Sequence, residues 1–309
     1  MTDSPPEPSI SVVIPTFERA RELRLCLEGF RNQTLAAEEF EVIVVDDGSS
    51  CDLEAVVTAF PGLRLEFRRS KHGGPSVARN IALDMARAPL LLLYDDDLQP
   101  SPMILEYCLD FHRRCTADNA AALLYFTRDT TRPASPFEDW AFSQLYTFPA
   151  TPGIYGWSHF WSGTVTCKKR LLSGYNFNPR YRAVEDAELA FRISRSCGLE
   201  VHFEPRPCGH FLRRLTFDDV CRRQRQMGYY RFQLAAECRK RLVFSHPVYR
   251  WPEEHLVEDR ILLQTAKALA ALDGPFASAT ASALWELVDN HSIATGWLAA
   301  QRGIPPEAL

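Results

Sequence analysis

Short apolar runs alternate with helical patterns over the first part of the chain. Residues 10–14 are mostly β-branched and precede Pro15, which is typical of a strand, and apolar residues over 23–30 then recur at helical spacing. A second run, 40–45, is almost continuously apolar, as in strands that are buried on both faces of a parallel sheet. The order strand, helix, strand predicts a βαβ unit.

The same alternation continues as far as residue 94. The pattern predicts a helix over 53–60, a strand over 64–68, a helix that Pro75 opens, and a fully buried strand over 90–94. Such regular alternation predicts an α/β fold, a three-layer sandwich with a mainly parallel central sheet.

The pattern is less regular after residue 100. We expect a long loop over 127–155, because that stretch is rich in Thr, Pro, Ser and aromatic residues without a clear period. The other predicted elements are helices over 103–114 and 187–196, strands over 120–126, 162–167 and 200–204, and helices from 216 onward. The predicted domain organisation is a lead-in over 1–9, an α/β domain over 10–215 with halves 10–100 and 101–215, and a helical extension over 216–309.

Composition and charge exclude several classes of protein. A net charge of −4 provides no global basic field, so no nucleic-acid partner is expected. The nine cysteines form no Cys-x-x-Cys motif and predict reduced thiols, not zinc sites. The apolar run over 88–94 is far shorter than the about twenty residues that a membrane span needs. With no signal-like N-terminus, we expect a cytoplasmic protein without a transmembrane segment.

Acidic residues directly follow two of the predicted strands. One strand runs into Asp46-Asp47-Gly48-Ser49, and another runs into Asp95-Asp96-Asp97. In an open parallel sheet, ligands bind in the crevice beyond the carboxyl ends of the strands. We therefore expect both clusters to open into one crevice, although Asp46-Asp47-Gly48-Ser49 alone is also a common turn sequence.

Three consecutive aspartates at the edge of an apolar core repel one another unless a cation joins them. Hard oxygen ligands without a nearby cysteine favour Mg²⁺ or Mn²⁺ over zinc. The alternative is a solvated turn in which Asp97 caps the next helix. Because the sequence holds neither a Gly-x-Gly-x-x-Gly after its first strand nor a Gly-Lys-Ser/Thr, phosphates would depend mainly on the metal. Asp47 is placed to accept hydrogen bonds from a base or ribose.

Four short motifs follow one another along the predicted α/β domain. They are Ser11-Val12-Val13-Ile14-Pro15-Thr16-Phe17-Glu18, Val44-Val45-Asp46-Asp47-Gly48-Ser49, Gly73-Gly74-Pro75-Ser76-Val77-Ala78-Arg79-Asn80 and Tyr94-Asp95-Asp96-Asp97. Their order and spacing resemble those of family 2 glycosyltransferases with the GT-A fold. Further on, Glu185-Asp186 is similar to that family's Glu-Asp motif, and His210 lies where some members have a metal-binding histidine. The resemblance covers roughly residues 10 to 215.

The resemblance implies a role for each motif. The nucleotide-sugar-binding residues would be Pro15, Thr16, Phe17, Glu18, Asp47, Arg79 and Asp96, with Asp47 on the base and Arg79 near the donor. Asp95 and Asp97 would form the metal site with the donor diphosphate, and His210 would be a further ligand. Two alternatives stay open, since Arg79 could instead brace the acidic crevice and His210 could be a hydrogen-bonded loop histidine.

The chemistry of sugar transfer matches these parts. Breaking the bond between sugar and nucleoside diphosphate leaves negative charge that a metal stabilises, and the acceptor hydroxyl gives its proton to a base. Asp186 is the candidate base, although it could serve only as a helix cap. Trp161, Gly163 and Glu185 are candidate acceptor-binding residues, and Trp161 is equally suited to the core.

The sequence therefore predicts a glycosyltransferase that uses Mn²⁺ or Mg²⁺ and moves a single sugar from a nucleoside diphosphate sugar to an acceptor hydroxyl. Inversion at the sugar is implied by the resemblance alone. The alternatives are a nucleotidyltransferase and a catalytically silent module that binds sugar nucleotides or glycans. The apolar residues of the C-terminal helices leave a homodimer through those helices open.

Overall fold

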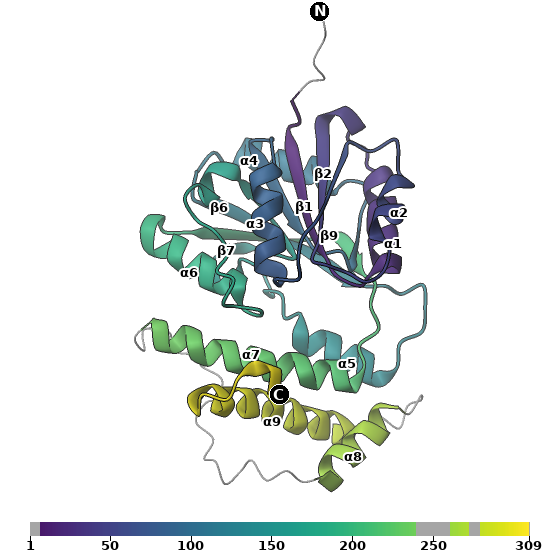
Figure 1. Ribbon diagram of the computed structural model, residues 1–309, viewed down its shortest axis with the longest axis vertical. Helices are drawn as coiled ribbons and strands as arrows, with labels where there is room; N and C mark the ends of the chain where they lie inside the picture. The colour runs from purple at the N-terminus through teal and green to yellow at the C-terminus, as the bar shows by residue number, and fades with distance from the viewer. Residues whose placement is uncertain (1–6, 239–259, 272–278, 309) are drawn as a thin grey trace, which may run out of the picture. The chain divides into compact units, whose positions relative to one another are not determined.

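The chain forms two compact units in the computed structural model, which describes residues 7–238, 260–271 and 279–308 (Figure 1). The first unit contains residues up to 129 together with 148–181 and 185–213, and the second contains 130–147, 182–184 and residues from 214 onward. Parts of the predicted lead-in over 1–9 and of the predicted extension over 216–309 lie outside the described residues. Across the described ranges, we find no helix with both the length and the apolar character needed to cross a membrane.

The first unit is built on a nine-stranded sheet within the described residues. Its strands are β1 (Ile10–Thr16), β2 (Phe40–Asp46), β3 (Leu65–Arg69), β4 (Leu90–Tyr94), β5 (Leu98–Pro100), β6 (Ala120–Arg128), β7 (Gly153–Tyr155), β8 (Thr164–Lys168) and β9 (Glu200–Phe211). The order is β3-β2-β1-β4-β8-β6-β9-β5, with β7 beside β9. Strands β1 to β4 pair in parallel, whereas β8 pairs antiparallel with β4 and β6. The predicted mixed α/β fold with a mainly parallel sheet is confirmed.

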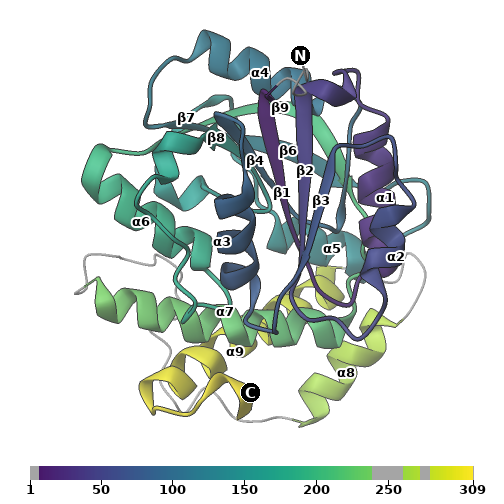
Figure 2. The same cartoon turned by 45° about the horizontal axis from the view of Figure 1, so that its top comes forward.

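Helices cover both faces of this sheet (Figure 2). They are α1 (Ala20–Arg31), α2 (Leu53–Thr58), α3 (Pro75–Met85), α4 (Ile104–Arg114) and α6 (Glu185–Cys197), with short 3₁₀ turns at Ala37–Glu39, Trp157–His159 and Lys169–Leu172. Helices α3 and α6 bury Ala82 and Ile193 in one cluster with Leu93 of β4. Successive side chains of a strand point to opposite faces, so Tyr94 meets the other layer, where Phe30 of α1 packs edge-on against it at 5.4 Å.

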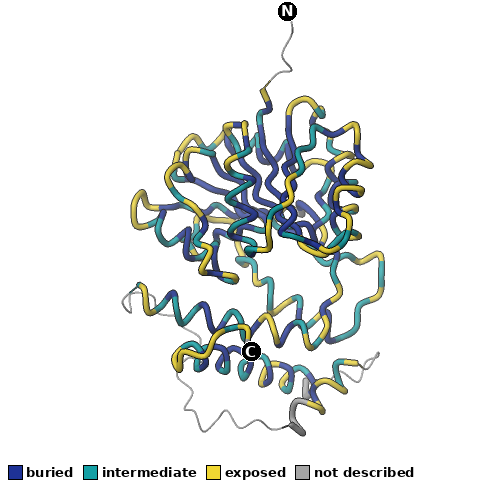
Figure 3. The backbone as a smooth tube through the Cα atoms, in the orientation of Figure 1, coloured by how far each residue is buried: buried dark blue, intermediate teal, exposed yellow. Residues whose placement is uncertain are grey.

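Strands β1 and β2 are buried along their whole length, which Figure 3 shows as dark tube through the centre of the first unit. This burial explains their continuous apolar sequences, because side chains on both faces of the sheet meet helices. It also leaves the carboxyl ends of β1, β2 and β4 as the places where polar side chains can emerge beside one another. The fold thus brings the sequence motifs to one edge.

The second unit is helical and begins within the stretch that we expected to be a loop. It contains α5 (Pro136–Leu145), α7 (Phe217–Glu237), α8 (Arg260–Ala270) and α9 (Ala279–Gln301), followed by a 3₁₀ turn at Pro306–Ala308. The loop prediction over 127–155 is therefore wrong. The N-terminal signal of α5 is a capping box in which Ser135 and Glu138 bond each other's backbone N–H groups.

An aromatic cluster forms the core of the second unit. Trp285 of α9 is 1% exposed and donates from Nε1 to the carbonyl oxygen of Ala266 at 3.1 Å. Phe137 and Trp140 of α5 pack against its ring with centroids 5.3 and 5.7 Å away. Helix α5 is thus held by burial of its aromatic side chains.

Helices α7 and α9 approach each other closely through two glycines. A Cβ atom on Gly228 would lie 1.9 Å from the carbonyl oxygen of Ile293, and one on Gly296 would lie 1.7 Å from that of Arg225. The two pairs run in opposite directions along the helices, so the packing is antiparallel. Backbone sits against backbone here, and no flexible side chain is available to make room.

We expect Gly296→Ala to lower the free energy of unfolding by about 1–3 kcal/mol, because the added methyl forces α7 and α9 apart. Urea denaturation measures the change. Gly62→Ala is the matched control, since a Cβ atom there meets nothing within 4 Å. Equal stability of both variants would contradict the close packing of α7 and α9.

Candidate active site

Asp95 is the first of three carboxylates at the end of β4. Its backbone N–H donates to the carbonyl oxygen of Gly163 at 2.9 Å, and its Oδ1 accepts from Arg79 Nη2 at 2.8 Å. A Cβ atom on Gly163 would lie 2.4 Å from Asp95 Oδ2. The absence of a side chain at residue 163 therefore leaves the space that the Asp95 carboxylate occupies.

Asp96 and Asp97 turn toward the start of α1. Asp96 Oδ2 accepts from Thr16 Oγ1 at 2.6 Å, and its Oδ1 accepts from Arg19 Nη1 at 2.7 Å. The same Arg19 nitrogen lies 3.2 Å from Asp97 Oδ2, and Arg213 Nη1 lies 3.7 Å from that oxygen. Burial raises the pKa of Asp96 to about 7, because the cost of desolvating its charge outweighs the attraction of Arg19.

Asp47 lies at the end of β2 and accepts hydrogen bonds from the loop before α3. Gly73 N donates to its Oδ1 at 2.8 Å and Gly74 N donates to its Oδ2 at 2.9 Å. His72 Nδ1 lies 2.9 Å from Oδ2, and the His72 ring meets that of Phe17 with centroids 4.5 Å apart. Phe17 is 41% exposed, so it presents an open aromatic face near the Asp47 carboxylate.

Glu18, the last residue of the first motif, forms hydrogen bonds with the loop after β2. Its backbone N–H donates to Ser49 Oγ at 2.8 Å, and its Oε1 accepts from Ser50 N at 2.5 Å. Its φ is +55°, and Val184, just before Glu185-Asp186, has a φ of +56°. Within the described ranges these are the non-glycine residues with positive φ. A β-branched residue in this region is strained, and such strain concentrates at functional sites.

Asp186 lies in the first turn of α6. Its Oδ2 accepts from Ser162 N at 3.2 Å, and its Oδ1 accepts from Ala187 N at 2.7 Å, so the carboxylate also satisfies a donor of its own helix. Burial, with the negative charge of Glu185 next to it, raises the pKa of Asp186 to about 6. A carboxylate with this pKa is basic enough to accept a proton near neutral pH.

Arg79 bridges the carboxylates of Asp95, at the end of β4, and Glu185, at the start of α6. It is 4% exposed and donates from Nη1 to Glu185 Oε1 at 2.7 Å and from Nη2 to Asp95 Oδ1 at 2.8 Å. The Glu185 carboxylate is thereby engaged with Arg79. The brace that we left open as an alternative for Arg79 is present in the structure.

The side chains of His210 and Trp161 form hydrogen bonds with residues other than the carboxylates. His210 is exposed on β9, where it pairs with Gln99 of β5, and its Nδ1 lies 2.9 Å from Thr127 Oγ1. Trp161 donates from Nε1 to Ser158 O at 3.1 Å and packs against the core. No group of three His, Cys, Asp or Glu side chains in the described parts of the chain is already arranged to hold a metal.

Three basic residues of the site were missed at the sequence level. Arg19 and Arg213 lie at Asp97, and His72 lies at Asp47. Arg19 directly follows the first motif, and His72 directly precedes Gly73-Gly74, so adjacency to a motif was the available signal. The direction of long, flexible side chains does not follow from sequence spacing.

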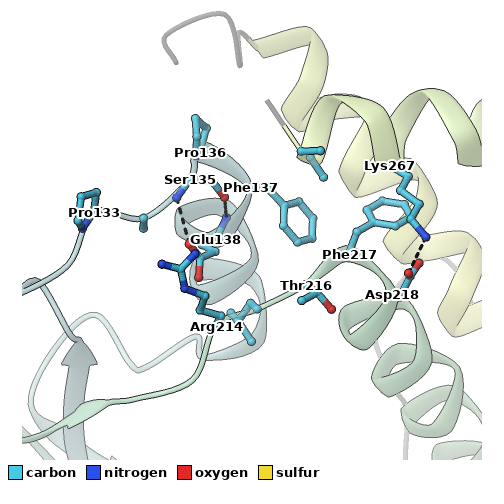
Figure 4. A pocket seen from close by; sticks show the side chains of 14 residues that line it. Pro133, Ser135, Pro136, Phe137, Glu138, Arg214, Thr216, Phe217, Asp218 and Lys267 are labelled. Carbon is cyan, nitrogen blue, oxygen red and sulfur yellow. Dashed lines mark hydrogen bonds and ion pairs between the residues drawn. The ribbon is translucent and has the colours of Figure 1, made fainter. Parts of the chain in front are cut away.

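Two cavities are lined by residues other than these carboxylates. The first cavity has a volume of about 1050 Å³ and lies in the first unit. Its lining includes Leu90 and Leu91 of β4 and residues 168–170. The other, of about 680 Å³, lies in the second unit between α5, α7 and α8 (Figure 4). Phe137 and Phe217 line it, and Lys267 Nζ contacts Asp218 Oδ2 at 2.6 Å on its wall.

We expect Arg79→Met to lower the free energy of unfolding by about 3 kcal/mol, because it leaves two carboxylates without their buried counter-charge. Adding Glu185→Gln should recover part of the loss. Arg114→Met is the matched control, since Arg114 contacts Asp110 and Glu204 at the surface, where such pairs contribute about 1 kcal/mol or less. A stable Arg79→Met protein in urea denaturation would contradict the bracing role.

Comparison with known proteins gives relatives that match about a third of the chain. Validoxylamine A glucosyltransferase of Streptomyces hygroscopicus subsp. jinggangensis is 38% identical over 108 residues, which are 34% of this chain and 26% of that protein. Poly(ribitol-phosphate) beta-N-acetylglucosaminyltransferase TarP of Staphylococcus aureus is 32% identical over 91 residues, 28% of each chain. The chain thus spans about a quarter of the length of these relatives.

Solved structures share the fold over nearly the whole chain. Mannosyltransferase PcManGT of Pyrobaculum calidifontis, in complex with GDP-Man and Mn²⁺, has a TM-score of 0.64 at 17% identity and covers 97% of this chain and 89% of its own. Staphylococcus aureus TarS 1-349 has a TM-score of 0.56 at 17% identity, covering 96% and 92%. The model of glycosyl transferase family 2 matches residues 11–170, just over half of the 309 residues, and the chain therefore belongs to that family.

Proposed function

We propose that this protein is a metal-dependent, inverting glycosyltransferase that moves one sugar from a nucleoside diphosphate sugar to an acceptor hydroxyl. One observation carries the proposal. Neighbouring residues at the start of β8 contact both acidic groups, since the Gly163 carbonyl accepts from Asp95 N and the Ser162 N–H donates to Asp186 Oδ2. The backbone of residues 162–163 thus contacts both the backbone N–H of Asp95 and the carboxylate of Asp186, whose pKa is raised by burial.

The donor nucleotide would bind between the ends of β1 and β2. Phe17 offers an exposed ring for the base, and Asp47 offers carboxylate oxygens whose positions two backbone N–H groups fix. Asp96 would accept hydrogen bonds from the ribose. Pro15, Thr16 and Glu18 would shape this pocket, Thr16 through its bond to Asp96 and Glu18 through the loop after β2.

A divalent metal fits the oxygen ligands of this edge. Asp95 and Asp97 would hold it, because hard carboxylate oxygens suit Mn²⁺ and Mg²⁺, which commonly bind through one or two carboxylates plus substrate phosphates. His210 would add a ligand through Nε2, since its Nδ1 contacts Thr127. When bound, the metal would stabilise the negative charge on the departing diphosphate. Mn²⁺ in the complex of PcManGT with GDP-Man supports this choice.

Asp186 would take the proton of the acceptor hydroxyl. A single base acting opposite to the leaving diphosphate gives one displacement at the sugar carbon, and one displacement inverts its configuration. Glu185 and Arg79 would hold the base in position, and residues 101–215 would supply the acceptor half. Trp161 and Gly163 would border the acceptor, with Gly163 leaving room beside Asp95.

We expect Asp97→Asn to abolish the Mn²⁺-dependent binding of UDP or GDP, because an amide is a poor ligand for a hard cation. Calorimetry with and without Mn²⁺ measures the effect, and EDTA should stop sugar transfer by the unmodified protein. Asp84→Asn, at an exposed position, is the control. Full transfer activity in EDTA would rule out the metal.

We expect Asp186→Asn to lower the rate of transfer by about 10²–10⁴-fold while nucleotide binding is retained, because Asn is isosteric but cannot act as a base. In the unmodified protein, the rate should fall as the pH drops below about 6, where Asp186 becomes protonated. Rate, nucleotide affinity and melting temperature are measured on the same preparation. Near-normal transfer would leave Asp186 as a helix cap only.

A further inference from the structure

Arg19 is a partly exposed member of the charged group at the end of β4. The carboxylates that it contacts are fixed, since the Asp96 side chain is 1% exposed and that of Asp97 is 10% exposed. Arg19 itself precedes the first turn of α1, and 35% of its side chain is exposed. The partly exposed Arg19 side chain therefore contacts two buried carboxylates, those of Asp96 and Asp97.

The structure balances the charge of this acidic pair with arginine side chains. Adjacent buried carboxylates are costly unless positive charge compensates them. Arg19 Nη1 lies 2.7 Å from Asp96 Oδ1 and 3.2 Å from Asp97 Oδ2, and Arg213 lies 3.7 Å from the latter oxygen. A divalent cation on Asp97 would lie beside the Arg19 guanidinium, and the two positive charges would repel each other.

We propose that Arg19 is an internal counter-cation that competes with the metal for Asp97 and pairs with the donor diphosphate once the metal has taken its place. This inference rests on the proposed function. Without nucleotide, Arg19 weakens metal binding. With nucleotide, the phosphates receive the displaced guanidinium, so that metal and nucleoside diphosphate bind best together. Arg19 acts as a positioning residue that couples the two ligands.

The test is a titration of Arg19→Met, which keeps the length of the side chain and removes its charge. With Mn²⁺ alone as the probe, we expect at least 5-fold tighter binding than in the unmodified protein, the lower end of ordinary coupling between ligands. With saturating Mn²⁺, UDP or GDP should bind at least 5-fold more weakly. Arg19→Lys, which keeps the charge, should lie closer to the unmodified protein in both titrations.

Arg21→Met is the matched control. Arg21 lies in the first turn of α1, its side chain is 69% exposed, and it contacts Glu22, so its replacement should change neither titration. If Arg19→Met is less stable, the rise in its melting temperature on adding Mn²⁺ replaces the calorimetric value, because a ligand of the native state raises that temperature. The rise should exceed that of the unmodified protein.

The outcomes separate this proposal from the proposed function. Equal or weaker Mn²⁺ binding by Arg19→Met, in an unmodified protein that needs Mn²⁺ for transfer, would overturn the role of Arg19 alone. Absence of Mn²⁺ binding by both proteins, even with UDP or GDP, would overturn the metal site and the role of Arg19 together. Tighter Mn²⁺ binding with unchanged nucleotide affinity would contradict the transfer of Arg19 to the diphosphate.

Discussion

Compensation of negative charge at the carboxyl edge of the sheet is the constraint on which this site depends. Asp95, Asp96 and Asp97 follow a strand whose last four residues are buried, where isolated carboxylates would be costly. Arg79 donates to Asp95 from a buried position. Arg19, which is partly exposed, contacts Asp96 and Asp97. Arg79 is buried, whereas 35% of the Arg19 side chain is exposed. The protein's own arginine side chains therefore compensate the negative charge of this edge.

The backbone links this acidic edge to the candidate base. Ser162 and Gly163 enter β8, which pairs antiparallel with β4, so their peptide groups face the residues that follow β4. One peptide carbonyl receives Asp95, and the preceding N–H binds Asp186. Main-chain atoms of Ser162 and Gly163 thus contact both acids, Asp95 at its backbone N–H and Asp186 at its side chain.

The sequence predicted the sheet well because burial on both faces leaves a continuous apolar signal in β1, β2 and β4. The acids after those strands were found because their positions follow from the topology of a parallel sheet. Arg19 and His72 were missed because the reach of a side chain depends on tertiary packing. Helix α5 was missed because its apolar residues serve an aromatic cluster with Trp285, far along the chain, and its local signal was only the capping box at Ser135 and Glu138.

The family model matches only part of the candidate site. The matched segment, residues 11–170, contains the carboxylates of the donor edge together with Arg19, Arg79 and Gly163. Glu185, Asp186 and His210 lie beyond it, so the roles proposed for them draw on the contacts that they make in this structure. Several relatives share only about 100 residues with the chain. Helix α6 and strand β9, whose residues the proposed mechanism uses, thus lie outside the segment that the family model matches.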